Sequence, residues 1–151
     1  MRSVLLGLAI LFGGCGAQAA APASVMASSG QLRAEASPAR LAAGGTVHVT
    51  LTVSGPIDYE VGCVQTLHIW AVDSQGRQVW AEPVPAIMCM ALGRKSLQAG
   101  ETATFSADWP TSSSLKAGAY SIHGLFLTVL PVGAGTRVRE NLPPLTVQLT
   151  A

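Results

Sequence analysis

The sequence predicts an all-β protein, an immunoglobulin-like antiparallel β-sandwich of seven to nine strands that follows a signal peptide. Three observations lead to this fold class. Short runs alternate between apolar and polar residues, glycine- and proline-rich turns separate these runs, and no stretch has the 3.6-residue apolar period of an amphipathic helix. The length of 151 residues fits one domain.

A four-residue phrase, Leu-x-Ala-Gly, occurs three times, and each time it precedes an alternating run. The phrases begin at Leu41, Leu97 and Leu115. Glycine accepts the positive φ that the third position of a type II turn requires, so each phrase predicts a tight turn into a strand. The leucine can fold back over one end of the core. Because the phrases are unequally spaced, they do not form a repeat array.

The alternating runs give the strands in order. Val47, Val49 and Leu51 share one face of the clearest run, which Gly55-Pro56 stops. Asp73-Ser-Gln-Gly76 has the composition of a hairpin turn. The paired prolines 143 and 144 interrupt the last strand, which predicts a sheet edge or a bulge. The expected strands are Gln31–Ser37, Thr46–Val53, Val64–Val72, Arg77–Ala81, Thr102–Trp109, Ala119–Leu130, Arg137–Glu140 and Leu145–Leu149.

The N-terminus has the pattern of an export signal. Arg2 supplies a positive charge, the apolar run 4–12 is too short to span a bilayer, and Ala17-Gln-Ala19 is a small-x-small cleavage signal. We therefore expect a signal peptide over residues 1–19, a flexible tether over residues 20–30 and the domain over residues 31–151. The small, polar composition of the tether favours a disordered link.

Cysteine usage leaves two processing routes open. Leu11-Phe-Gly-Gly-Cys15 resembles a bacterial lipobox, in which the cysteine is lipidated and becomes the new N-terminus. Cleavage after Ala19 is the other route. Either way the expected location is the cell envelope, the periplasm or the exterior, with membrane attachment only through a lipid on Cys15. Cys63 and Cys89 then remain, and exported proteins usually pair two such cysteines, so we expect a disulfide between them.

The charge balance argues against a nucleic-acid partner. Without Arg2 the chain has eight basic and eight acidic residues and no basic run. Phosphate binding and electrostatic attachment to anionic lipids both need clustered Lys and Arg, so neither is expected.

Candidate catalytic residues are sparse, and we expect no enzyme and no cofactor. The histidines His48, His68 and His123 stand singly in three different strands, where a solvated or hydrogen-bonded role is expected. Asp58 and Glu60 follow a turn and are expected in an exposed loop. The glycines precede strands rather than helices, so no phosphate-binding loop is predicted.

A copper site is a second alternative to a purely structural role. Met88-Cys89-Met90 offers soft sulfur ligands that suit Cu(I). Alternate strand residues point to opposite faces, however, and methionine is an ordinary core residue, so core packing with a disulfide is the competing interpretation.

Two tryptophans are expected to differ in their surroundings. Trp109 shares a face with Phe105 and is expected in the core. Trp70 lies on the face opposite Leu67 and Ile69, so an exposed sheet face can present it. An exposed tryptophan is a candidate binding hot spot.

Three motifs in the middle of the chain carry a family resemblance. They are the segment 73–80 (DSQGRQVW), the segment 97–109 with Gly100-Glu101, Phe105 and Trp109, and the Gly-x-Tyr phrase that ends at Tyr120. In this order they resemble the intracellular proteinase inhibitors of bacilli, the BsuPI-type domain. The resemblance covers roughly residues 46–130. It implies an immunoglobulin-like sandwich and inhibition of a serine protease. The export signal and the sulfur residues at 88–90 depart from the family.

These observations predict a non-enzymatic exported domain that binds a protein partner, with proteinase inhibition as the form that the resemblance implies. Candidate inhibitory loops are Pro83–Leu92 and Thr111–Leu115. An envelope-anchored structural or assembly lipoprotein is one alternative, and a periplasmic copper-binding protein is another.

Overall fold

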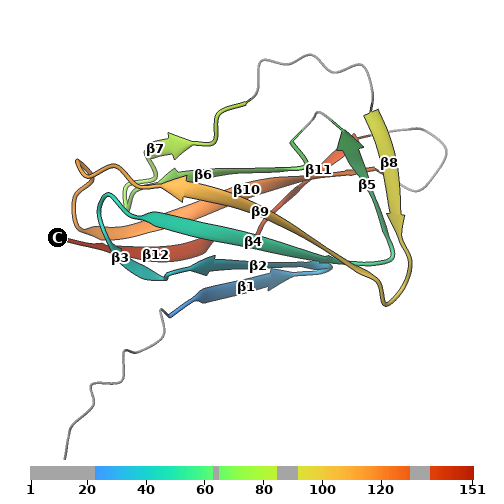
Figure 1. Ribbon diagram of the computed structural model, residues 1–151, viewed down its shortest axis with the longest axis horizontal. Coiled ribbons are helices and arrows are strands. Elements are labelled where there is room, and N and C mark those ends of the chain that lie inside the picture. Colours follow the sequence, from blue (N-terminus) through green and yellow to red (C-terminus); the bar gives the residue numbers. More distant parts are fainter. Residues whose placement is uncertain (1–22, 63–64, 85–91, 130–136) are drawn as a thin grey trace, which may run out of the picture.

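A computed structural model describes residues 23–62, 65–84, 92–129 and 137–151. These residues form strands joined by turns and no helix (Figure 1). The strands are β1 (Val25–Ser29), β2 (Leu32–Ser37), β3 (Arg40–Ala42), β4 (Thr46–Ser54), β5 (Ile57–Gly62), β6 (Leu67–Val72), β7 (Gln78–Ala81), β8 (Leu92–Leu97), β9 (Thr102–Pro110), β10 (Gly118–Val129), β11 (Arg137–Asn141) and β12 (Leu145–Thr150).

The strands form two sheets that pack face to face, so the predicted immunoglobulin-like sandwich is confirmed, although the described residues form twelve strands rather than the seven to nine expected. The first sheet has the order β1-β2-β4-β9 and is antiparallel throughout. In the second sheet the long strand β10 pairs with β12 and β11 along one side and with β6 and β5 along the other. Strands β7 and β8 extend this sheet, and β3 joins β12 as a parallel pair.

The interruption at the two C-terminal prolines lies where the sequence predicted it. Strand β11 ends at Asn141 and β12 begins at Leu145, and both pair with β10. Leu142 bridges them, because its N–H donates a 2.9 Å hydrogen bond to the Gly124 carbonyl. Proline has no backbone N–H, so the hydrogen bonds with β10 are interrupted at residues 143–144 and begin again in β12.

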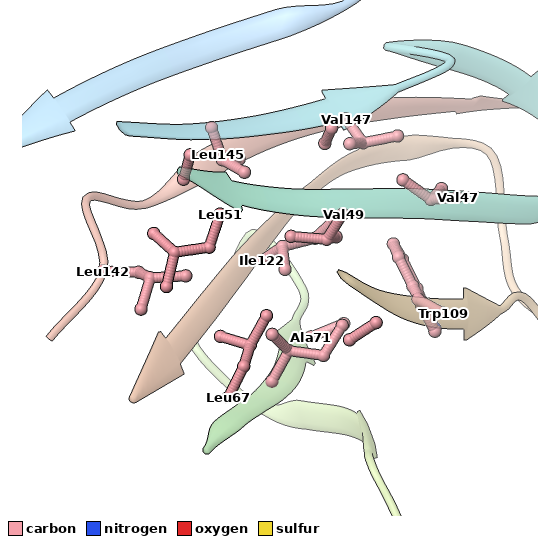
Figure 2. Packing of buried hydrophobic residues seen from close by; sticks show 14 of the residues in the cluster. Val47, Val49, Leu51, Leu67, Ala71, Trp109, Ile122, Leu142, Leu145 and Val147 are labelled. Carbon is pink, nitrogen blue, oxygen red and sulfur yellow. The ribbon is translucent and has the colours of Figure 1, made fainter. Parts of the chain in front are cut away.

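The core fills the space between the sheets, and Figure 2 shows part of it. Val47, Val49 and Leu51 of β4 are completely buried, as their alternation predicted. Trp109 is also completely buried, as predicted, and its ring centroid lies 5.8 Å from that of Tyr120. The Tyr120 hydroxyl donates a 2.8 Å hydrogen bond to the Lys116 carbonyl four residues upstream, which is a tyrosine corner as found in immunoglobulin-like domains.

Two of the three Leu-x-Ala-Gly phrases form the predicted turn. Gly44 and Gly100 have φ values of +91° and +88°, and each is the third residue of a turn closed by a backbone hydrogen bond. Gly118 instead opens β10 with φ at +154°. The leucines of all three phrases are partly buried against the core, as expected.

The structure differs from the sequence prediction in four places. β1 lies inside the segment that was expected to be a flexible tether, residues 20–30, because Val25 and Ala27 pack against the core while β1 pairs with β2. The short strand β3 was not expected. β5 replaces the loop expected around Asp58 and Glu60, and the strand β8 was not expected.

Several predictions fall on residues outside the described ranges. These are the signal peptide over residues 1–19, the lipidation of Cys15, the Cys63–Cys89 disulfide and the sulfur-rich segment 88–90. They stay predictions. Within the described ranges, no helix is long and apolar enough to cross a membrane.

Candidate binding surface

Three aromatic rings lie together on the outer face of the second sheet. His68 and Trp70 alternate with the buried Leu67 and Ile69 along β6, so their side chains face away from the core. β10 pairs beside β6 in a register that places His123 directly opposite Trp70. The Trp70 and His123 rings stack, with centroids 5.6 Å apart and planes 14° apart. The His68 ring lies 6.2 Å from Trp70 on the same face.

An open pocket of about 380 Å³ adjoins these rings. Strands β7, β6, β10 and β11 contribute to it in that spatial order, together with the residues just before β6 and just after β7. We call this surface, with His123 included, the Trp70 face. Its pocket is lined by Gln65, His68, Trp70, Gln78, Val84, Leu125, Leu127 and Arg139.

The lining combines apolar side chains with uncharged or basic polar groups. Leu125 and Leu127 project outward from β10 and are half-buried, and Val84 is 74% exposed. Arg139 is exposed on β11, opposite Leu127. None of the described residues that line the pocket is acidic. Such a surface favours a ligand that has an apolar part and a negative charge.

His68 carries an uncommon feature for a surface residue. Its Nδ1 atom is buried and has no hydrogen-bond partner among the described residues. The Trp70 face thus includes a polar atom that is unsatisfied within the described residues.

Glu82 ties β7 to β6 beside the Trp70 face. Its N–H donates a 3.0 Å hydrogen bond to the Ile69 carbonyl, and its Oε2 accepts one of 3.3 Å from the Ile69 N–H. Burial raises the pKa of the Glu82 carboxyl, against the opposing effects of the Ile69 N–H and the nearby His68. These contacts extend the hydrogen bonding between β6 and β7 beyond the end of β7. They help to hold in place the strand that carries Gln78.

The remaining candidate residues have structural roles. The third histidine, His48, lies on the first sheet, where its Nδ1 is 2.8 Å from Asp108 Oδ1, so its predicted hydrogen-bonded role is confirmed. The prediction of an exposed loop at Asp58 and Glu60 is wrong, because both belong to β5. Asp58 forms an ion pair with Arg94 of β8 instead.

The segment Thr111–Leu115 is a closed turn. Thr111 is buried, and its hydroxyl accepts a 3.0 Å hydrogen bond from the Gly44 N–H and donates one of 2.8 Å to the Gly45 carbonyl. The Leu115 N–H donates to the Ser112 carbonyl. A protease cleft binds an extended loop, so this segment lacks the conformation that an inhibitory loop needs.

No metal cluster occurs in the part of the chain that the structure describes. No group of three or more His, Cys, Asp or Glu side chains lies close enough there to hold an ion. Met88, Cys89 and Met90 lie outside that part, so the copper hypothesis stays a prediction.

Trp70 was predicted from the sequence to lie on an outer sheet face, whereas most of the residues around it were not predicted to belong to a site. Alternation in β6 placed Trp70 on an outer face, and the structure leaves it half-buried there. Arg139, Gln78 and the leucines of β10 were not singled out. Alternation along 119–130 puts His123, Leu125 and Leu127 on one face, which was the available signal, but only the register of β10 with β6 brings that face to Trp70.

Comparisons with known proteins support the fold. No family model matches the chain, and no curated protein matches it in sequence. Among solved structures, the C-terminal domain of Wzt is similar, with a TM-score of 0.50 and 12% identity over 86% of this chain and 80% of that one. Spo0M, the sporulation control protein of Bacillus subtilis, gives a TM-score of 0.46 and 10% identity over 80% of this chain and 49% of that one. At such identity the likeness to Wzt concerns the fold alone.

Proposed function

We propose that this protein is an exported, non-enzymatic domain that binds a protein partner through the Trp70 face. The observation that carries the proposal is the ring group of Trp70, His68 and His123 beside an open pocket on an outer sheet face. Single hydrophobic residues are common on protein surfaces, whereas a cluster of aromatic rings beside a pocket is typical of a binding site.

The residue types of this face favour a protein partner. Tryptophan and arginine are enriched among the residues that dominate binding free energies, and this face has both, in Trp70 and Arg139. Lysine and acidic residues are depleted at such interfaces, and none lines the pocket in the part of the chain that the structure describes. Strands fix the backbone at both Trp70 and Arg139, so little backbone entropy is lost on binding.

Site-specific photocrosslinking in the native envelope tests this proposal. A benzophenone amino acid replaces Gln78 on the Trp70 face, and in a control protein it replaces Thr104, which is exposed on the opposite sheet. We expect a discrete protein adduct from position 78 that is lost with Trp70→Ala, and none from position 104. Equal adducts from both positions, or none from position 78, would contradict the proposal.

Proteinase inhibition is the specific form of protein binding that the BsuPI-type resemblance implies, and we keep it as part of the proposal. Because Thr111–Leu115 is a closed turn, Pro83–Leu92 is the remaining candidate loop. The mature domain, assayed at micromolar concentration against secreted serine proteases, should slow at least one of them. If every protease keeps its full rate, the inhibitory form is wrong, while a binding role through the Trp70 face is still decided by crosslinking.

The anchored alternative is decided by the mature N-terminus. Mass spectrometry of protein purified from its own envelope distinguishes a lipidated Cys15 from an N-terminus at Ala20. A lipidated Cys15 places the Trp70 face on a membrane-attached protein and favours an assembly role.

A further inference from the structure

We propose that the pocket of the Trp70 face recognises an acidic side chain of the partner at Arg139 and an apolar side chain of the same extended segment at Trp70. This inference rests on the proposed protein-binding function and specifies its chemistry. It makes the preferred ligand an extended peptide segment with a carboxylate and an aromatic residue on one side.

Charge complementarity supports the acidic part. Arg139 is exposed and forms no ion pair with the described residues, whereas Arg77 and Arg94 are each paired with an aspartate. Among the described residues, no carboxylate lines the pocket that could pair with the Arg139 guanidinium from within. A guanidinium binds a carboxylate through two parallel hydrogen bonds, which gives direction as well as affinity.

The apolar part follows from the rest of the lining. Trp70, Leu125 and Val84 offer an indole and two aliphatic side chains around the hollow, and Val84 is one of two large hydrophobic residues, with Met26, that are strongly exposed in the described part of the chain. Gln65 can bind the backbone of a ligand, since an amide both donates and accepts hydrogen bonds. A pocket of about 380 Å³ lies at the small end of ligand pockets and suits side chains rather than a folded domain.

The strand register sets the spacing between the two subsites. Trp70 is opposite His123, and Arg139 is opposite Leu127 on the far side of β10. Two strand spacings across and four residues along the sheet separate their Cα atoms by roughly 16 Å. An extended chain covers about 13 Å in four residues, and residues i and i+4 lie on the same side. The long arginine side chain can cover the difference, so we expect acidic and aromatic residues four positions apart.

Short peptides and NMR test this inference on the mature protein. The probe is a blocked pentapeptide with glutamate at one end and phenylalanine at the other, used in both orders and separated by small residues. Comparison peptides have glutamine or lysine in place of glutamate. The readout is the indole N–H resonance of Trp70, assigned with a Trp70→Phe variant.

We expect one glutamate peptide to shift this resonance and to bind about three- to tenfold more tightly than its glutamine counterpart, as for a partly exposed charged pair. Arg139→Gln should cause the same loss and should abolish the difference between the two peptides. Arg40→Gln, which removes an equal charge from the distant strand β3, should change nothing.

Three outcomes would overturn the inference. They are a lysine peptide that binds as well as the glutamate peptide, an equal loss in Arg40→Gln, and a shift of the Trp70 resonance by a neutral disaccharide but by no peptide. The last outcome would reassign the pocket to a saccharide. A fourth outcome, in which no peptide binds while the crosslink at position 78 forms, would leave the proposed function standing and would overturn only its charge chemistry.

Discussion

Gly55 is the residue at which close packing is most demanding. Its N–H donates a 2.9 Å hydrogen bond to the Glu101 carbonyl, and a Cβ there would collide with the backbone carbonyl of Gln98. Gly55→Ala therefore has to push the corner between β4 and β5 away from the turn before β9. We expect a loss of about 2–3 kcal/mol in the free energy of unfolding, measured with urea.

Gly100→Ala is the matched control for this substitution. Gly100 has a positive φ, unlike Gly55, and a Cβ there meets nothing within 4 Å. Only conformational strain remains, so we expect about 1 kcal/mol. A cost for Gly55→Ala no larger than that of Gly100→Ala would mean that the corner relaxes freely.

Glu82 gives a pH dependence with a defined sign. Burial raises the pKa of its carboxyl in the folded state above the ordinary 4.5. The folded protein thus binds this proton more tightly than the unfolded chain, and the contribution of Glu82 to stability falls as pH rises from 4.5 through the raised pKa. Glu82→Gln keeps an acceptor for the Ile69 N–H and should remove this dependence. Urea midpoints at pH 5 and pH 7 measure it, and an unchanged difference between these midpoints would refute the assignment.

At the scale of elements, the predicted strands correspond to those whose alternation is complete. The runs over 46–53 and 102–109 became β4 and β9, each with one residue added at its end. β5 was missed although Ile57, Tyr59 and Val61 alternate, because Gly55-Pro56 and two acidic residues suggested a loop. β1 was missed for a different reason. Only Val25 among its five residues has a strong strand propensity, and pairing with β2 determines the conformation of the rest.

The residues of the Trp70 face also differ in whether the sequence alone could predict them. Alternation within one strand was enough to place Trp70 outward. The neighbours of Trp70 depend on pairing between strands that are distant in sequence, since β6 and β10 are about fifty residues apart. Arg139 joins the site only because β11 returns along β10 in one register. Such registers arise from the packing of both sheets, and a single sequence carries no direct signal for them.

The pair β5–β8 carries a second titrating group. Hydrogen bonds from Ser96 and Arg94 lower the pKa of Asp58 below its ordinary 3.8. Its contribution to stability is therefore present above pH 3.8 and is lost as pH falls through the lowered pKa. Arg94→Gln should lower the free energy of unfolding at neutral pH. It should also reduce the further loss of this free energy as the pH falls. Urea midpoints between pH 7 and pH 2.5 test this, with Arg40→Gln as the control for charge. If the urea midpoints of Arg94→Gln and of the native protein change in parallel with pH, Arg94 does not contribute to the lowered pKa of Asp58.

At the scale of the whole molecule, β9 joins the two sheets through aromatic contacts at two places. Phe105 of β9 packs against Tyr59 and Phe126 of the second sheet, with ring centroids 5.3 and 5.1 Å apart. Four residues further along, Trp109 packs against Tyr120. The outer face of the second sheet thus carries the Trp70 group, while its inner face is held to the first sheet by separate aromatic contacts.

Double-mutant cycles can test whether these two contacts act separately. Tyr59 and Phe105 meet edge to face, so Tyr59→Leu and Phe105→Leu should be non-additive by about 0.5–1.5 kcal/mol in the free energy of unfolding. Phe105 and Trp109 lie about 13 Å apart along β9, so Phe105→Leu and Trp109→Phe should add to within about 0.5 kcal/mol. Urea unfolding of each single and double variant measures both coupling energies. Equal coupling in the two cycles would mean that the sandwich responds as one continuous core. In that case a substitution on the inner face would also change the surroundings of the Trp70 ring. The indole resonance of Trp70 would then shift in the Phe105→Leu variant.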